Sequence, residues 1–301
     1  MWQQLLEQIQ AGNVKTLART ISIIENEYQG YEQLLGLLHG NQQTKIIGIT
    51  GPPGAGKSTL VDGLVGELVK NKQKVAVLCV DPSSPFNMGA VLGDRIRMSQ
   101  WYSNANVYIR SLASRGSMGG LHPKIIEITE LVKAARFDYI ILETVGVGQS
   151  EIDIAGLADI TVVVVVPESG DEIQTMKAGL MEIADVFVVN KSDRPDADAF
   201  VKNLRLMLAP AFSSHKKEVP IVKTVASEGT GIKELWEIIE AQESMEAIND
   251  RRLWLLTDKV YLLLQQERMK NVNKGMIRAE IQSRLSKKEN FNLYQFVQQF
   301  K

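Results

Sequence analysis

The sequence predicts an α/β fold, with a mainly parallel sheet flanked by helices, an N-terminal helical segment and a C-terminal helical arm. Three observations carry this prediction. Seven short runs rich in Val and Ile alternate with helical patterns between Thr44 and about Glu240. These runs are almost continuously apolar, which is typical of parallel strands buried on both faces. A glycine-rich turn joins the first run to a helical pattern, as in many sheets of this class.

Seven segments are predicted to be strands, and in such sheets ligands bind at the carboxyl ends of the strands. Apolar residues at helical spacing predict helices before the first strand and again beyond Gly231. We therefore expect a helical segment at 1–42, an α/β domain at 43–240 and a helical arm at 241–301. Helical spacing alone leaves open whether the arm packs on the core or pairs with a second copy. The strands, in chain order, are Ile46–Thr50, Val75–Val80, Val107–Arg110, Tyr139–Glu143, Thr161–Val166, Val186–Asn190 and Ile221–Thr224.

The amino-acid composition limits the kinds of partner that we expect for this protein. With 301 residues, 45% of them hydrophobic, the chain is long enough to bury a large core. With a net charge of −1, the chain lacks the excess positive charge that would favour binding to nucleic acid or to an anionic membrane. The longest apolar run, Ile160 to Pro167, is far too short to span a bilayer. The single cysteine, Cys79, excludes an internal disulfide and fits a reducing compartment. Together with the short apolar run, this leads us to expect a cytoplasmic protein without membrane insertion.

The most informative motif follows the first strand, where the sequence has the pattern G-x-x-x-x-G-K-[ST]. Glycines let the backbone wrap around phosphate oxygens, and the N-terminus of the following helix favours negative charge. In this pattern Lys57 reaches the outer phosphates and Ser58 binds Mg²⁺. The alternative is an ordinary Gly/Pro turn, but the complete pattern between strand and helix favours a nucleoside triphosphate. The predicted nucleotide-binding residues here are Gly51, Pro53, Gly54, Ala55, Gly56, Lys57, Ser58 and Thr59.

A second motif, N-K-x-D, ends the sixth predicted strand with Asn190, Lys191 and Asp193. An aspartate accepts two hydrogen bonds from the N1–H and N2 amino groups of guanine, whereas adenine offers no such pair. The motif therefore predicts GTP and GDP as ligands, with the alternative of a solvated Lys/Asp turn. After the next strand, the backbone of Ala226, Ser227 and Glu228 is in the position to contact the guanine O6.

Acidic residues at further strand ends predict a magnesium site. Glu143 ends the fourth strand and is followed by Gly146, in the position of a D-x-x-G switch. Asp81 follows the second strand and Asp94 lies further on, and oxygen ligands are those that Mg²⁺ prefers. For both aspartates the alternative is a structural turn. Gln149 is placed to orient water or to serve as an ordinary surface residue. The candidate catalytic residues are Lys57, Asp81, Glu143 and Gln149, and the candidate metal ligands are Ser58, Asp81, Asp94 and Glu143.

Together these residues closely resemble the MeaB/ArgK family of P-loop GTPases, which includes the human methylmalonic aciduria type A protein. The resemblance covers most of the chain, and the E-T-V-G replacement of D-x-x-G is more specific than the phosphate-binding loop. It is carried by GPPGAGKST at 51–59, VDPSSPF at 80–86, LGDRIRM at 92–98, RGSMGGL at 115–121, ETVGVGQSE at 143–151, PESGDEIQTMKAGLMEIAD at 167–185 and NKSD at 190–193.

The resemblance implies a GTPase chaperone that gates cofactor loading and protection of an adenosylcobalamin-dependent acyl-CoA mutase, usually methylmalonyl-CoA mutase. It also implies a homodimer formed through the C-terminal arm. Asp171, Gln174 and Lys177 match a switch segment that communicates with the mutase. The chain departs from the family pattern at 87–90 and at Arg95, where many members have Lys, and this bears on the hydrolysis rate.

Three other functions compete with the chaperone. One is a kinase or ATPase that serves basic amino-acid transport, although the N-K-x-D motif argues against ATP. Another is a nickel metallochaperone, which would be expected to carry clustered Cys and His ligands, whereas this chain has one Cys and three dispersed His residues. The third is a nucleotide-binding partner with negligible turnover, because intrinsic hydrolysis by switch GTPases is slow, on the order of 10⁻⁴ s⁻¹.

Overall fold

The computed structural model describes residues 1–38, 43–81, 98–114, 121–146, 151–169, 178–212, 219–242, 250–269, 272–287 and 291–298. Contacts divide the chain into two compact units, Met1–Arg252 and Leu253–Lys301. The three-part division drawn from the sequence stays a prediction.

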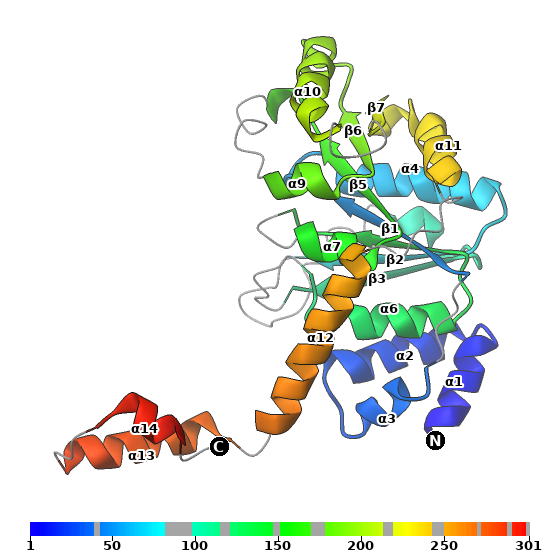
Figure 1. Ribbon diagram of the computed structural model, residues 1–301. Coiled ribbons are helices and arrows are strands. Elements are labelled where there is room, and N and C mark those ends of the chain that lie inside the picture. Colours follow the sequence, from blue (N-terminus) through cyan, green and yellow to red (C-terminus); the bar gives the residue numbers. More distant parts are fainter. Residues whose placement is uncertain are drawn as a thin grey trace. The chain divides into compact units, whose positions relative to one another are not determined.

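The first unit is built on a seven-stranded sheet in the order β3-β2-β4-β1-β5-β6-β7 (Figure 1). Every pairing between neighbouring strands is parallel, which confirms the predicted fold class. All seven predicted strands are present, and β3 is longer than expected because it continues to Ala113. The strands are β1 (Lys45–Thr50), β2 (Val75–Asp81), β3 (Val107–Ala113), β4 (Tyr139–Glu143), β5 (Ile160–Val165), β6 (Val186–Asn190) and β7 (Ile221–Thr224).

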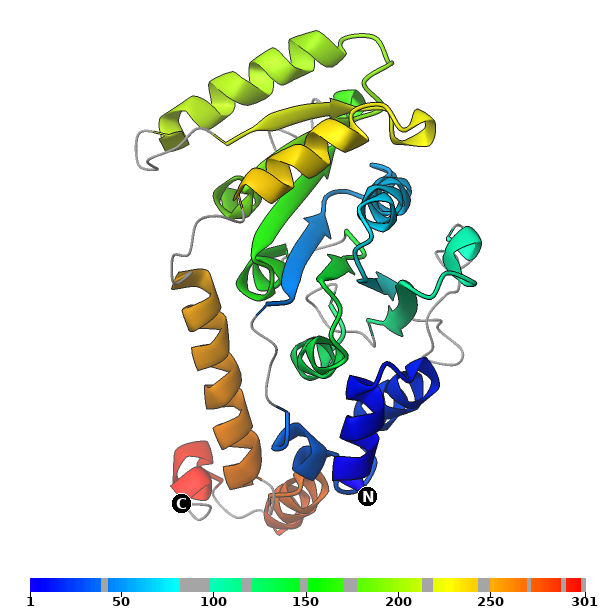
Figure 2. The same cartoon turned by 90° about the vertical axis from the view of Figure 1, so that its right-hand side faces the viewer.

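Helices cover both faces of this sheet (Figure 2). On one face, α4 (Lys57–Lys70) and α11 (Ile232–Gln242) pack on Val and Ile side chains from six of the strands. The opposite face carries α6 (Ile125–Ala134), α7 (Glu151–Leu157), α9 (Ala178–Ile183) and α10 (Ala197–Phe212). Burial on both faces explains why the strand sequences show no alternation of apolar and polar residues. Single 3₁₀ turns are η1 (Ser99–Trp101), η2 (Pro167–Ser169) and η3 (Ala226–Glu228).

At the amino edge of the sheet, three aspartates that precede strands satisfy backbone N–H groups of neighbouring segments. Asp159, before β5, accepts a hydrogen bond of 2.7 Å from Ile46 N in β1. Asp185, before β6, accepts one of 2.7 Å from Thr161 N in β5. Asp138, before β4, accepts one of 2.7 Å from Lys74 N, next to β2. These carboxylates fix the amino ends of the strands, and so the register that determines which residues meet at the carboxyl edge.

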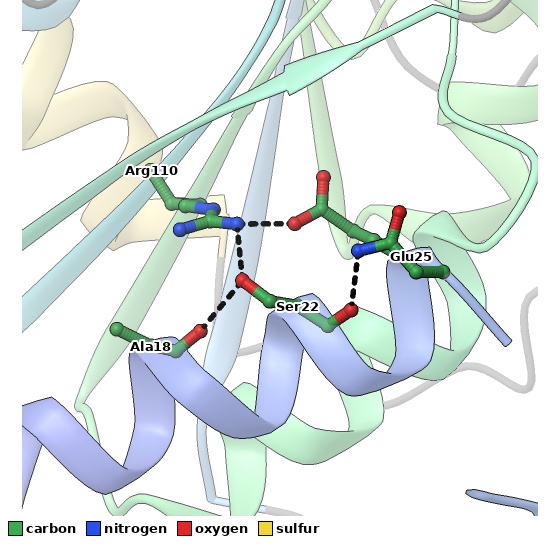
Figure 3. Close-up of polar contacts among 5 residues, drawn as sticks. Ala18, Ser22, Glu25 and Arg110 are labelled. Carbon is green, nitrogen blue, oxygen red and sulfur yellow. Dashed lines mark hydrogen bonds and ion pairs between the residues drawn. The ribbon is translucent and has the colours of Figure 1, made fainter. Parts of the chain in front are cut away.

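The N-terminal segment forms α1 (Trp2–Gln10), α2 (Val14–Glu25) and α3 (Tyr31–Leu35), as predicted. Helices α1 and α2 pack on α6 (Figure 1). Figure 3 shows Arg110 reaching from edge strand β3 to α2, where it donates a hydrogen bond of 2.9 Å to Ser22 Oγ and pairs with Glu25.

A second ion pair joins the connection between α2 and α3 to the residue that precedes α6. Lys124 Nζ lies 2.8 Å from Glu27 Oε1 and donates a hydrogen bond of 3.0 Å to Tyr31. Burial by itself would lower the pKa of Lys124, but the hydrogen bonds with Glu27 and Tyr31 outweigh it and raise that pKa above its ordinary value. The ammonium therefore stays charged through the neutral range.

The second unit contains most of α12 (Asp250–Met269), together with α13 (Lys274–Ser286) and α14 (Leu293–Val297). Phe296 of α14 is buried, with its ring centroid 5.4 Å from that of Phe291 and 5.1 Å from the Arg284 guanidinium. Helix α14 is too short for its periodicity to predict it from sequence. None of the helices in the described ranges combines the length and apolarity that crossing a membrane requires.

Candidate functional site

The phosphate-binding loop lies between the end of β1 at Thr50 and the start of α4 at Lys57. Gly51, Gly54 and Gly56 all have positive φ, at 137°, 76° and 90°. A Cβ on Gly56 would lie 2.3 Å from the side-chain nitrogen of Asn190, so only glycine permits this close approach. The loop therefore adopts the backbone geometry that its sequence pattern predicts.

Lys57, at the first position of α4, is buried and turned back onto its own loop. Its Nζ donates hydrogen bonds of 2.9 Å to Gly51 O and 3.0 Å to Pro52 O. The ammonium is thus held at the mouth of the loop by two carbonyl oxygens. Phosphate oxygens, which are negatively charged, are stronger partners for this group than neutral carbonyls.

The next residue, Ser58, joins the loop to strand β4. Ser58 Oγ donates a hydrogen bond of 2.7 Å to Glu143 Oε1, and both side chains are buried. Asp81, also buried, ends neighbouring strand β2, where Cys79 is in register with Glu143. A hydroxyl and two carboxylates from adjacent segments are a donor set that fits Mg²⁺, which takes oxygen ligands and retains several waters.

After β4 ends at Glu143, the chain continues into the segment that holds Gly146. The φ of Gly146 is 84°, and a Cβ there would lie 2.3 Å from Gly51 O and 2.5 Å from Lys57 Nζ. The structure therefore brings the predicted switch glycine against the phosphate-binding loop and its lysine. Gly146 thus lies beside the lysine that the motif predicts to reach the outer phosphates.

Asn190, at the end of β6, connects three loops. Its Nδ2 donates a hydrogen bond of 2.8 Å to Ala55 O in the phosphate-binding loop. Its Oδ1 accepts bonds of 3.0 Å from Thr224 Oγ1 and 3.1 Å from Ala226 N. Lys191 adds a bond of 2.7 Å from its Nζ to Gly54 O. These contacts fix the N-K-x-D loop relative to the phosphate-binding loop.

The carboxylate predicted to recognise guanine is exposed. Asp193 projects from the loop after β6, and Ser227 and Glu228 are exposed on the neighbouring loop after β7. A backbone bond of 3.0 Å from Ser192 N to Thr224 O holds these two loops together. Beyond Asp193, Arg194 forms an ion pair with Glu168 of η2, which links the loop to the segment after β5.

The remaining predicted site residues lie outside the described residues. These are Asp94 from the proposed metal shell, Gln149 from the proposed catalytic set, and the three proposed partner-switch residues Asp171, Gln174 and Lys177. Their proposed roles stay predictions.

Three threonines of the site were given no role by the sequence motifs, although Thr144 lies within E-T-V-G. Thr224 bonds Asn190, and the hydroxyl oxygens of Thr50 and Thr144 lie 2.9 Å apart in the core of the site. The signal for the last pair was present as two threonines at the ends of two predicted strands. Pairing them requires knowing that β1 and β4 are neighbours, which motif spacing does not give.

Comparisons with known proteins agree with this geometry. The family model described as "Methylmalonyl Co-A mutase-associated GTPase MeaB" matches residues 17–285. A protein of Pyrococcus abyssi named as a GTPase is 41% identical over 296 residues, covering 96% of this chain and 89% of its own length. The methylmalonic aciduria type A homolog of Caenorhabditis elegans is 37% identical over 208 residues, covering 64% of this chain and 52% of its own.

A similar fold is found in the crystal structure of a protein named as a LAO/AO transport system kinase. Its TM-score is 0.70 at 26% sequence identity, and the match covers 99% of this chain and 96% of that chain. The similarity therefore extends beyond the sheet to nearly the whole length of both proteins.

Proposed function

Since the chain belongs to the family of methylmalonyl Co-A mutase-associated GTPases, we propose that it is a GTP-hydrolysing chaperone for an adenosylcobalamin-dependent acyl-CoA mutase. In this role its nucleotide state gates cofactor loading and protection of the mutase. The observation that carries the proposal is the joining of the two nucleotide motifs by Asn190, which bonds Ala55 O and Ala226 N.

Guanine selectivity follows from Asp193. Its carboxylate is exposed and lies in a loop held by the Asn190 and Ser192 bonds, so it is available to a ligand and fixed in position. GTP and GDP present two donors to this carboxylate, whereas ATP leaves it without a matching pair. Ala226, Ser227 and Glu228 supply backbone contacts beside the base.

Triphosphate binding draws Lys57 away from Gly51 O and Pro52 O toward the phosphate oxygens. Ser58, Asp81 and Glu143 would hold Mg²⁺, directly or through water, and the ion would neutralise charge on the phosphates. The present bond from Ser58 to Glu143 keeps these oxygens together. Asp94 and Gln149 are proposed to complete the metal shell and to orient the attacking water.

Hydrolysis acts as a timer because the outer phosphate is what the Gly146 backbone detects. Loss of that phosphate removes a contact from the segment after β4, which is the usual logic of a GTPase switch. We propose that a second switch containing Asp171, Gln174 and Lys177 carries this change to the mutase. A slow basal rate accelerated by the mutase is the expected kinetic behaviour.

We also propose that the protein is a homodimer formed through α12. This helix exposes far more apolar surface than isolated surface residues provide, and such patches mark interaction sites. In the proposed dimer, the second copy would cover the exposed apolar side chains of α12. These are Leu253, Trp254, Leu256, Val260, Tyr261, Leu262, Leu263 and Leu264. Sedimentation of the wild-type protein tests the dimer, and Trp254→Glu with Tyr261→Glu is expected to give a monomer.

A second candidate function is that of a transport-associated kinase. It rests on the name of the structurally similar LAO/AO transport system kinase. ATP specificity is the observation that would favour it, and Asp193 argues against this. We further propose a cytoplasmic location, supported by the single cysteine, Cys79, which is buried and leaves the chain unable to form an internal disulfide. The net charge of −1 gives no support for a nucleic-acid partner.

The experiment that tests the nucleotide part of this proposal compares the affinities of GTP and ATP in the presence of Mg²⁺. Lys57→Ala is expected to lose triphosphate binding or turnover while keeping the fold, as judged by circular dichroism. Lys70→Ala is the matched control, because Lys70 lies at the far end of the same helix, is exposed, and pairs with Glu67. Wild-type turnover by Lys57→Ala contradicts the role of this lysine.

A further inference from the structure

We propose that Thr144 is a positioning residue, which acts through its hydroxyl contact with Thr50 to hold the metal-binding end of β4 against the phosphate-binding loop. The inference rests on the magnesium-dependent GTP site of the proposed function and gives a role to two threonines: Thr50, which precedes the phosphate-binding motif, and Thr144, which lies within E-T-V-G. It concerns the arrangement of Glu143 and Gly146 and assigns Thr144 no contact with the nucleotide.

The contact arises from the parallel pairing of β1 and β4. Ile49 is in register with Glu143, and Thr144 N donates a backbone hydrogen bond of 3.1 Å to Ile49 O. The two threonines come next along their strands, and their Oγ1 atoms lie 2.9 Å apart. Relative exposure is 0% for Thr50 and 2% for Thr144, so this hydrogen bond is shielded from water.

The positions of the two threonines in the chain give the pair its significance. Thr50 directly precedes Gly51, and Thr144 lies between the magnesium-site acid Glu143 and the switch residue Gly146. Three contacts therefore join these segments: the Ser58 bond to Glu143 at 2.7 Å, the threonine pair, and the close approach of Gly146 to Gly51 O.

Of these three contacts, only the hydrogen bond between Thr50 and Thr144 is independent of the ligand. Ser58 and Lys57 exchange their present partners for metal and phosphate oxygens when a nucleotide binds, and Gly146 then meets the outer phosphate. The hydroxyl pair belongs to neither group, so it keeps Glu143 aligned with Ser58 in both states. A buried hydroxyl that loses its only polar partner is destabilised, which makes the alignment sensitive to either threonine.

The test measures the Mg²⁺ concentration that gives half-maximal GTP affinity, alongside GDP affinity in EDTA. Valine has nearly the shape of threonine without the hydroxyl, so Thr144→Val and Thr50→Val each remove the bond from one side. Each is expected to raise the half-maximal Mg²⁺ concentration by about tenfold, in the range seen when groups that orient metal ligands are removed. GDP affinity in EDTA is expected to stay within about twofold, and Thr144→Ser is expected to retain the wild-type Mg²⁺ response.

Thr161→Val is the matched control. Thr161 is 1% exposed, and its hydroxyl has no hydrogen-bond partner within the described part of the chain. This variant is expected to leave the Mg²⁺ response unchanged. If Thr144→Val fails to fold, Thr50→Val and the double Thr50→Val/Thr144→Val variant, which leaves no orphaned hydroxyl, carry the same test.

Two results overturn the inference alone, given a normal wild-type response. One is an unchanged Mg²⁺ requirement in both single valine variants. The other is an equal loss of Mg²⁺-dependent GTP affinity and of GDP affinity in EDTA, which indicates general disruption of the site. Absence of Mg²⁺-dependent GTP binding by the wild-type protein instead refutes the proposed function and this inference with it.

Discussion

Ser58 at the start of α4 and Glu143 at the end of β4 share a buried hydrogen bond of 2.7 Å, although 85 residues separate them in the chain. The bond places the serine hydroxyl of the phosphate-binding motif against the acid of the proposed switch. It joins the proposed phosphate-binding and metal-binding parts of the site.

Glu143→Gln removes the negative charge and keeps the shape of this acid. We expect the Mg²⁺ requirement for GTP hydrolysis to rise by about 10–100-fold, because a neutral amide binds a hard cation less well. Phosphate release measured across a Mg²⁺ titration checks this. Glu130→Gln is the control, since Glu130 is a partly exposed carboxylate of α6 that pairs with Lys133. An unchanged Mg²⁺ requirement in Glu143→Gln removes this acid from the metal site.

Asp193→Ala is expected to abolish guanine selectivity, because the carboxylate supplies the two acceptors that distinguish guanine from adenine. Loss of a charge-assisted pair with the base corresponds to about 100-fold weaker GTP binding. Competition binding with GTP and ATP measures the ratio. Asp198→Ala provides the control, because Asp198 is exposed and pairs with Lys223. Selectivity that survives Asp193→Ala contradicts the assignment of the base site.

Gly146→Ala separates backbone strain from contact with the phosphate-binding loop. Gly146 and Gly12 share a φ of 84°, but nothing lies within 4 Å of a Cβ on Gly12. In Gly12→Ala the only cost is therefore that of holding alanine in the left-handed conformation, which lowers the free energy of unfolding by about 1 kcal/mol. Gly146→Ala additionally meets Gly51 O and Lys57 Nζ, and we expect GTP affinity to fall by at least about tenfold. Equal, unimpaired GTP binding by both variants is the contrary result.

Arg110→Met is expected to loosen the N-terminal helices from the sheet. The side chains of Arg110 and Glu25 are 28% and 10% exposed, so the methionine removes a positively charged partner from a largely buried carboxylate. We expect a loss of about 2 kcal/mol in the free energy of unfolding, below the cost for a fully buried pair. Urea denaturation measures it, and the Glu25→Gln/Arg110→Met double variant is expected to recover part of the loss. Full additivity of the two changes argues against direct coupling.

Local sequence was sufficient to predict the sheet and the two nucleotide motifs. Strands such as Val186–Asn190 consist of residues that favour burial on both faces, and the residues after them carry the polar groups at the carboxyl edge. The glycine pattern at Gly51–Gly56 likewise encodes its own backbone geometry, which the positive φ values bear out. In both cases the information lies within a few consecutive residues.

Contacts between distant segments were not predictable in the same way. The Thr50–Thr144 pair depends on β4 lying beside β1, and the Arg110–Glu25 pair depends on α2 packing near the edge strand. Each requires the strand order, which the spacing of motifs does not determine. The aspartate caps at Asp159 and Asp185 depend on it for the same reason, since each bonds a neighbouring strand.

The central claim is that this chain is a GTPase whose turnover responds to an acyl-CoA mutase. The most direct test measures GTP hydrolysis by the wild-type protein alone and with methylmalonyl-CoA mutase, beside a pull-down of the two proteins and the Lys57→Ala variant as a control for contaminating activity. We predict a stable complex and a rate at least about tenfold above a slow basal rate. No complex and no change in rate with any adenosylcobalamin-dependent acyl-CoA mutase would contradict the account.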